Sequence, residues 1–432
     1  MKKLLIVLFF PLLTFSQTPD SLDLKLLQSS GINLKNKDGK NIDFENNFIE
    51  NLDDYLIKNP NDIDSLYKRG MIFLVALDGL WSNQSIEYFD RIINIDPNVN
   101  VYDERGEAYY TNCVNGSKGT QNCSKALLDF EKAFELEKSL KDEKKIWFMM
   151  GRSLQLIAGK ELEINSKDAE PISYFDNAIE IDPNYSEAYR YRSVSKGLIG
   201  DNVGAENDIN LAISNDINNW ELYKTRGNIY YAIVYSNEPD KTESLKKAIM
   251  DYDKTIKFFW ENPINDKNSD FDASRISGIY ALRGDSKYFL KDYYGALEDH
   301  NIALNSSKKK PEYFSFRAKT HAKLKNYRNA ISDYDNAYKL EPNRQSLNEK
   351  ILMLLDAAFD SEGDEMLYFA NEGMRIMNIL NEAEPNNSTH YYFRGIFKWI
   401  YGDTSACRDV RISDNMGFNI PDGIVEAVCG SE

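Results

Sequence analysis

The chain has few of the side chains on which enzymes depend. Only three of its 432 residues are histidines, and the spacing of the surrounding alanines places His300 at the position of a core aromatic. His321 falls on the inward face of the following helix, and His390 has no partner in a recognisable motif, so we expect packed imidazoles instead of ligands or bases. No nucleophile elbow, phosphate loop, zincin motif or CxxC pair occurs. We therefore expect no enzymatic activity, no catalytic residue and no cofactor.

Positive charge is also scarce. The chain has 52 lysines and arginines against 68 aspartates and glutamates, which gives a formal net charge of −16. Such a surface repels phosphate backbones, and no local basic patch offsets it, so we expect no nucleic-acid partner. A basic protein partner is easier to accommodate.

Metal-binding patterns are incomplete. The stretch NDKNSDFD alternates carboxylate and amide side chains, as at the start of a calcium loop. Phe271 stands where such a loop needs glycine, and Ser277 replaces the bidentate glutamate. We interpret the stretch as a solvated acidic loop and expect no metal site.

Long hydrophobic runs are missing apart from one near the start. Leu4–Leu13 follows two lysines, is too short to span a bilayer, and is interrupted by Pro11. This pattern predicts a secretory signal peptide at residues 1–16. The first cysteine is Cys113 and no later segment could cross a membrane, so we expect an exported, periplasmic or extracellular protein without a lipid anchor or transmembrane segment. The Lys/Asn/Ile-rich composition suggests a Gram-negative bacterial envelope.

The four cysteines favour two disulfides in an exported chain. Cys113 and Cys123 flank a loop rich in glycine and asparagine, whereas Cys407 and Cys429 bracket the C-terminal end. Local pairing, Cys113 with Cys123 and Cys407 with Cys429, is the simplest of the three possible connectivities.

A repeated small–large–small spacing is present instead of catalytic motifs. Ala296, His300 and Ala303 recur 34 residues later as Ala330, Tyr334 and Ala337, along one face of a helix. The same i, i+4, i+7 spacing occurs in three further triplets: Ala126/Phe130/Ala133, Ala205/Ile209/Ala212 and Ala248/Tyr252/Thr255.

Another helix is predicted upstream of each such segment, marked by an aromatic residue and a glycine or other small residue four positions later. The pairs are Tyr102/Gly106, Trp147/Gly151, Tyr189/Ser193, Tyr223/Gly227, Tyr280/Gly284, Phe314/Ala318 and Tyr391/Gly395. Two short helices repeated every 34 residues resemble the tetratricopeptide repeat (TPR) family, in an exported bacterial form. The resemblance implies an all-α, right-handed superhelical solenoid of stacked helix–turn–helix repeats.

The predicted organisation has three parts. Residues 1–16 are the signal peptide, and residues 17–60 form an N-terminal segment with a lead-in helix. Residues 61–432 form an array of about nine repeats with a C-terminal cap.

An arginine and an aspartate occur together in six of these repeats, beyond what helical periodicity requires. The arginine precedes the small residue of the first helix, and the aspartate follows the first alanine of the second helix by three positions. We expect ion pairs that fix the two helices of each hairpin: Arg105–Asp129, Arg192–Asp208, Arg226–Asp251, Arg283–Asp299, Arg317–Asp333 and Arg394–Asp409.

The remaining first-helix positions suggest a binding surface, because the first helices of such solenoids line the concave face. The predicted concave-face residues are Asp103, Glu107, Tyr110, Lys224, Asn228, Tyr231, Asp285, Tyr288, Tyr392 and Trp399. Aromatic residues flanked by polar ones suit a peptide or protein segment. We therefore expect a non-enzymatic protein-interaction scaffold. The alternative is a glycan-binding protein whose groove aromatics stack on sugar rings.

Overall fold

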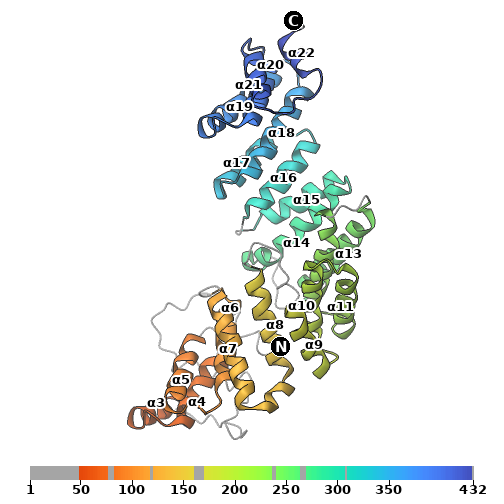
Figure 1. Ribbon diagram of the computed structural model, residues 1–432. Helices are drawn as coiled ribbons and strands as arrows, with labels where there is room; N and C mark the ends of the chain where they lie inside the picture. The colour runs from red at the N-terminus through yellow and green to blue at the C-terminus, as the bar shows by residue number, and fades with distance from the viewer. Residues whose placement is uncertain are drawn as a thin grey trace. The chain divides into compact units, whose positions relative to one another are not determined.

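The computed structural model describes residues 48–75, 82–116, 120–159, 170–235, 240–262, 269–306 and 309–430 (Figure 1). The predicted signal peptide and the segment 17–43 lie outside these ranges, as does the start of the acidic stretch compared with a calcium loop. Every regular element within the described ranges is a helix. The all-α prediction is therefore confirmed.

The chain divides into two compact units, the first ending at Ile229 and the second beginning at Tyr230. The first unit contains the helices α3 (Phe48–Lys58), α4 (Ile63–Val75), α5 (Ser82–Ile95), α6 (Tyr102–Val114), α7 (Thr120–Leu136), α8 (Lys144–Ala158), α9 (Glu170–Ile181), α10 (Ser186–Leu198), α11 (Asn202–Asn215) and most of α12 (Trp220–Tyr231). A short 3₁₀ helix, Lys138–Asp142, precedes α8.

The second unit continues the same alternation of helices. After a 3₁₀ turn at Ala232–Tyr235, it contains α13 (Thr242–Glu261), α14 (Asp270–Phe289), α15 (Tyr293–Leu304), α16 (Pro311–Lys323), α17 (Tyr327–Leu340), α18 (Arg344–Asp360), α19 (Gly363–Ala383), α20 (Ser388–Tyr401), α21 (Ala406–Asn415) and α22 (Ile424–Cys429).

Successive helices pack as antiparallel hairpins, with α4 on α5, α6 on α7, α8 on α9 and α10 on α11 in the first unit. In the second unit α14 packs on α15, α16 on α17, α18 on α19 and α20 on α21. The first helices also contact one another, α4 with α6, α6 with α8, α8 with α10, α14 with α16 and α16 with α18. Within each unit the first helices therefore share one surface, which we call the first-helix face, and the predicted helix–turn–helix stacking is confirmed.

A glycine and a ring interlock inside several hairpins. A Cβ atom added to Gly106 would lie 2.8 Å from Cε1 of Phe130, and Gly151 faces Phe175 at the same distance. Both phenylalanines are completely buried. Gly284 faces His300, which therefore fills the place of a core ring as predicted.

Burial lowers the pKa of all three histidines, His300, His321 and His390. His300 is fully buried, with Nδ1 3.1 Å from Oγ1 of Thr320, and burial lowers the pKa of its imidazole to about 4. All three imidazoles are therefore neutral at physiological pH.

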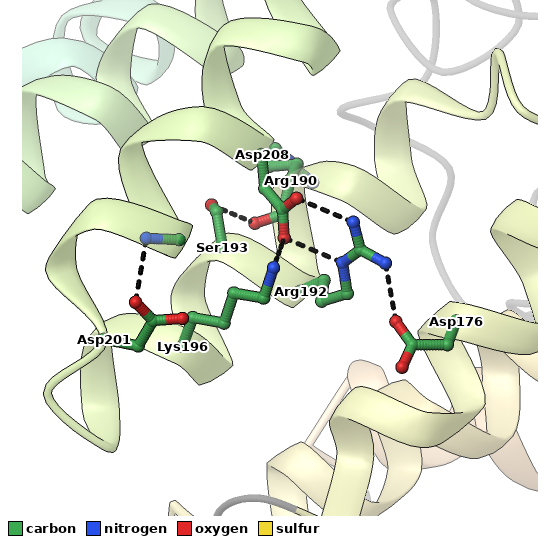
Figure 2. A network of polar contacts seen from close by, with 8 residues as sticks. Asp176, Arg190, Arg192, Ser193, Lys196, Asp201 and Asp208 are labelled. Atoms are coloured by element: carbon green, nitrogen blue, oxygen red, sulfur yellow. Dashed lines mark hydrogen bonds and ion pairs between the residues drawn. The ribbon is translucent and has the colours of Figure 1, made fainter.

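Arginines join the two helices of several hairpins. In Figure 2, Arg192 of α10 donates from Nε and Nη2 to the two carboxylate oxygens of Asp208 in α11, each at 2.7 Å. Lys196, one turn further along α10, lies 2.9 Å from the same carboxylate. The same bidentate contact is made by Arg105 to Asp129, Arg283 to Asp299, Arg317 to Asp333 and Arg394 to Asp409. Arg226 and Asp251 belong to different units, so that pair stays a prediction.

The third nitrogen of each arginine has a partner that the sequence pattern did not suggest. Nη1 of Arg192 donates to Asp176 of α9, the second helix of the preceding hairpin, at 2.5 Å (Figure 2). The corresponding acceptors are Asp90 for Arg105, Asn210 for Arg226, Asp253 for Arg283, Asn301 for Arg317 and Asn378 for Arg394. We call each set of arginine, aspartate and preceding Asp or Asn a ladder rung. A rung ties three consecutive helices together.

The cysteines are paired locally. The sulfur atoms of Cys113 and Cys123 lie at bonding distance and join α6 to α7, and those of Cys407 and Cys429 join α21 to α22. The C-terminal segment also stacks Phe418 on Tyr392 of α20, with ring centroids 4.7 Å apart. The C-terminal segment therefore covers part of α20, the first helix of the last hairpin, consistent with a cap.

Candidate functional site

An open groove of about 570 Å³ lies on the first-helix face of the second unit. Its lining comes from the end of α14, from α16 and the start of α17, and from one side of α18. Its lining includes Tyr288, Lys319, Tyr334, Glu349, Leu352, Met353 and Phe359. We call this feature the groove.

The helical repeat explains why these side chains converge. Tyr288 is eight residues after the aromatic marker of α14, and Lys319 is five residues after that of α16. Glu349, Met353 and Asp356 follow one another at helical spacing on α18. Each helix therefore contributes one stripe of side chains to the groove.

The groove combines a buried apolar floor with exposed apolar edges. Tyr334 and Met353 are almost completely buried, whereas Leu352 is 52% exposed and Phe359 is 60% exposed. Large apolar side chains with this exposure next to a concave surface are typical of interaction sites. The groove is thus suited to an apolar side chain of a partner.

Ion pairs connect the two sides of the groove. Nζ of Lys319 lies 2.8 Å from Oε1 of Glu349, and Nζ of Lys325 lies 3.1 Å from Oδ2 of Asp360. The hydroxyl of Tyr327 donates to Asp360 at 2.5 Å. Both signs of charge therefore line the groove, which offers donors and acceptors to a polypeptide backbone.

Tyr231 and Asp285, which were expected to face a partner directly, lie against each other. Tyr231 is 7% exposed and Asp285 is 4% exposed, and the tyrosine hydroxyl donates a hydrogen bond to the carboxylate. Burial raises the pKa of Asp285 to about 6, against the opposing effects of Tyr231 and Lys319. The two side chains are buried and satisfy each other, so a direct contact of either with a ligand stays a prediction.

The other predicted residues of the second unit have different surroundings. Tyr288 lines the groove, and burial raises the pKa of its hydroxyl to about 12. Tyr392 stacks on Phe418, whereas Trp399 remains 39% exposed. Of this group, only Tyr288 lies in the groove.

The predicted residues of the first unit lie on its own first helices. Glu107 pairs with Lys145 at 2.5 Å. Burial raises the pKa of Tyr110 to about 12, and burial also raises the pKa of the Asp103 carboxyl. Nζ of Lys224 lies 5.0 Å from the ring centroid of Trp220, and Asn228 is exposed.

Sequence reasoning missed several polar residues on the first-helix face. Lys319 and Arg152 are each five residues after an aromatic marker, and Arg190 is one residue after another. The guanidinium carbons of Arg152 and Arg190 lie 3.8 Å and 4.3 Å from the ring centroid of Tyr191. The positions one and five residues after the aromatic marker, taken in every repeat, would have identified them.

Among the residues that the structure describes, no group of three or more histidine, cysteine or acidic side chains is arranged to hold a metal ion. No described helix is long and apolar enough to cross a membrane.

Comparison with known proteins adds only distant similarities. No protein-family model and no curated protein matches the chain. Solved structures that resemble it include human IFIT1 with m7Gppp-AAAA, at 13% identity over 87% of this chain and 77% of that chain, with a TM-score of 0.46. PilF of Pseudomonas aeruginosa gives 15% identity over 59% and 98% of the two chains, with a TM-score of 0.42.

A tetratricopeptide repeat protein from Parabacteroides merdae is similar at the same level, with 15% identity over 74% of this chain and 94% of that chain and a TM-score of 0.40. Scores this low carry no argument about ligands or partners. The hairpins themselves have the form that the tetratricopeptide resemblance implies, since a glycine in one helix interlocks with a ring in the next.

Proposed function

We propose that this protein is a non-enzymatic scaffold that binds an extended segment of another protein in the groove. The exposed Leu352 and Phe359 beside a buried apolar floor are the observation that carries this proposal. Large apolar side chains of the partner segment would cover Leu352 and Phe359, and the paired charges around them would hydrogen-bond its backbone.

A peptide selection tests the proposal. Peptides selected from a random library on the wild-type protein should bind at least about tenfold more weakly to Phe359→Ala when titrated by calorimetry. Val203→Ala is the matched control, because Val203 is 74% exposed and lies in the first unit. Failure to select any peptide, or equal binding to both variants, would contradict the proposal.

A glycan array on the same proteins examines the alternative interpretation. Binding of sugars that disappears with Tyr288→Ala, in the absence of peptide binding, would replace the protein partner with a glycan. Loss of a stacking aromatic is expected to weaken a sugar complex more than loss of Phe359 at the edge of the groove.

We also propose that the protein is exported to the bacterial envelope or beyond. The signal-peptide pattern and the two cysteine pairs support this location. Expression in a Gram-negative host followed by intact-mass measurement should give a periplasmic chain that begins at Gln17. A cytoplasmic chain that retains residues 1–16 would contradict it.

A further inference from the structure

One ladder rung is incomplete in the α18–α19 hairpin. Lys350 occupies the position of the arginine, and its Nζ donates to Asp335 of α17 at 2.6 Å. Asp335 follows the rung aspartate Asp333 by two residues, as Asn210 follows Asp208 and Asn301 follows Asp299. In α19 the position two residues before the acceptor Asn378 is Ile376, so an isoleucine stands where a carboxylate is expected.

This substitution leaves the buried ammonium group of Lys350 with Asp335 as its single carboxylate partner in the described part of the chain. The side chain of Lys350 is 3% exposed, and Asp335, which is 45% exposed, is its one acceptor among the described residues. An ammonium group has three hydrogens to donate, and buried charges are normally paired and fully hydrogen-bonded. In the rungs built on Arg192 and Arg394, the buried aspartate accepts bonds from two cations at once.

A cavity occupies the space next to this group. It has a volume of about 190 Å³, and both Lys350 and Ile376 line it. Its walls also include the largely apolar side chains of Tyr338, Leu347 and Ile379, and its other polar lining residues are Asp335, Ser346 and Arg375. Cavities of about 150 Å³ are large enough to bind benzene, so a ring or short alkyl chain fits here together with a small polar group.

We propose that this cavity binds a small organic carboxylate, whose carboxylate group takes the place of the missing rung aspartate beside Lys350. The apolar part of the ligand would lie between Tyr338, Leu347 and Ile379. Arg375 lines the cavity, is 57% exposed, pairs with Glu372 at 2.9 Å and provides a second cation. Because Asp335 already pairs with Lys350, the site favours one added negative charge over the two charges of a phosphate monoester.

The ligand chemistry is tested with simple probes on the full chain. Benzoate and hexanoate should bind in calorimetric titrations and raise the melting temperature, whereas benzyl alcohol, which has the ring without the charge, should bind at least about tenfold more weakly. Equal binding of benzyl alcohol, or no binding of either acid, would overturn the proposal.

Three variants locate the site. Lys350→Met removes the charge, and Ile376→Asp supplies the missing carboxylate from within the protein, so each should abolish benzoate binding. Arg375→Gln changes an exposed side chain, threatens folding least, and should weaken binding severalfold. Benzoate binding at wild-type strength in the folded variants would overturn the proposal.

The control is Lys319→Met, which removes a cation from the groove on the other side of α18 and should leave benzoate binding unchanged. Loss of benzoate binding in this variant would move the carboxylate to the groove and overturn the assignment. The outcome is independent of the peptide selection, because the two experiments depend on different side chains.

Discussion

Individual aspartates in the rungs differ in how well their charge is compensated. Burial raises the pKa of the Asp409 carboxyl, but hydrogen bonds from Arg394 and Lys398 outweigh this effect and lower the pKa below its ordinary value. For Asp129, burial outweighs the bonds from Arg105 and the pKa is raised. The third acceptor contributes to the difference, since Asp90 adds negative charge beside Asp129 whereas Asn378 is neutral. The ladder therefore combines strongly and weakly compensated ion pairs.

Asp333→Asn should lower the stability of the second unit. Asp333 is 3% exposed and accepts two hydrogen bonds from Arg317 at 2.8 Å. An asparagine amide has one oxygen, so it can accept only one of these bonds, and it carries no negative charge to balance the guanidinium. We expect a loss of about 1–3 kcal/mol in the free energy of unfolding, measured by urea denaturation followed by circular dichroism. Glu341→Gln removes an exposed carboxylate and should have no such effect; equal losses in the two variants would contradict a structural role for the pair.

Asp285 should make stability depend on pH in the opposite direction from an ordinary ion pair. Its folded-state pKa of about 6 exceeds the ordinary value of 3.8, so the folded protein binds the proton more tightly than the unfolded chain. The contribution to stability is therefore present at pH 4 and is lost as the pH rises through 6, by up to about 3 kcal/mol.

Asp285→Asn removes this titration and provides the test. The variant should gain up to about 3 kcal/mol relative to the wild type between pH 4 and pH 7.5 in urea denaturation. Tyr231 can still donate to the amide oxygen, which keeps the local geometry. A stability difference that stays constant with pH would show that Asp285 titrates normally.

Helix pairs depend on close contact between a glycine and a ring. In an exposed helix, replacing glycine by alanine usually stabilises by up to about 1 kcal/mol, because it restricts the unfolded chain. Inside these hairpins the added methyl group meets a buried ring whose surroundings are closely packed. The neighbouring helix therefore decides whether replacing glycine by alanine raises or lowers the stability.

Gly106→Ala should destabilise the α6–α7 hairpin by about 1–3 kcal/mol, because the new Cβ would lie 2.8 Å from Phe130. Gly197→Ala is the matched control, since its Cβ would lie 4.0 Å from Ala205, an ordinary contact. Thermal unfolding should give a lower melting temperature for the first variant and an equal or higher one for the second. The same shift in both would contradict the interlocking role of Gly106.

The molecule as a whole carries one disulfide near the middle of the first unit and one at the end of the second. The cysteines of these pairs are separated by 10 and 22 residues, so loop-closure entropy predicts about 3 kcal/mol of stabilisation from each. In a repeat array each hairpin contacts mainly its neighbours, so such stabilisation acts locally.

Replacing Cys113 and Cys123 by serine should therefore increase hydrogen exchange in α6 and α7. Exchange in α20, α21 and α22, which belong to the other unit, should not change. Mass spectrometry of peptides from the exchanged protein measures both regions in one experiment. A uniform increase along the whole chain would mean that the array unfolds as a single cooperative body.

Much of the hairpin architecture could be predicted from local patterns. The small–large–small spacing and the glycine markers locate both helices of the α16–α17 hairpin, and the partners Arg317 and Asp333 are only 16 residues apart. The third acceptor, Asn301, was missed because it belongs to the preceding hairpin. The incomplete rung at Lys350 was missed for the same reason.

The sequence determined the all-α repeat and the pairing within hairpins, because these contacts join residues that one turn brings together. Only the tertiary structure decided which first-helix side chains remain accessible to a partner. Tyr231 and Asp285 are 54 residues apart and bury each other, whereas Tyr288 remains in the groove. Burial depends on what the neighbouring helices place opposite a side chain, and the groove and the cavity beside Lys350 each require several helices at once.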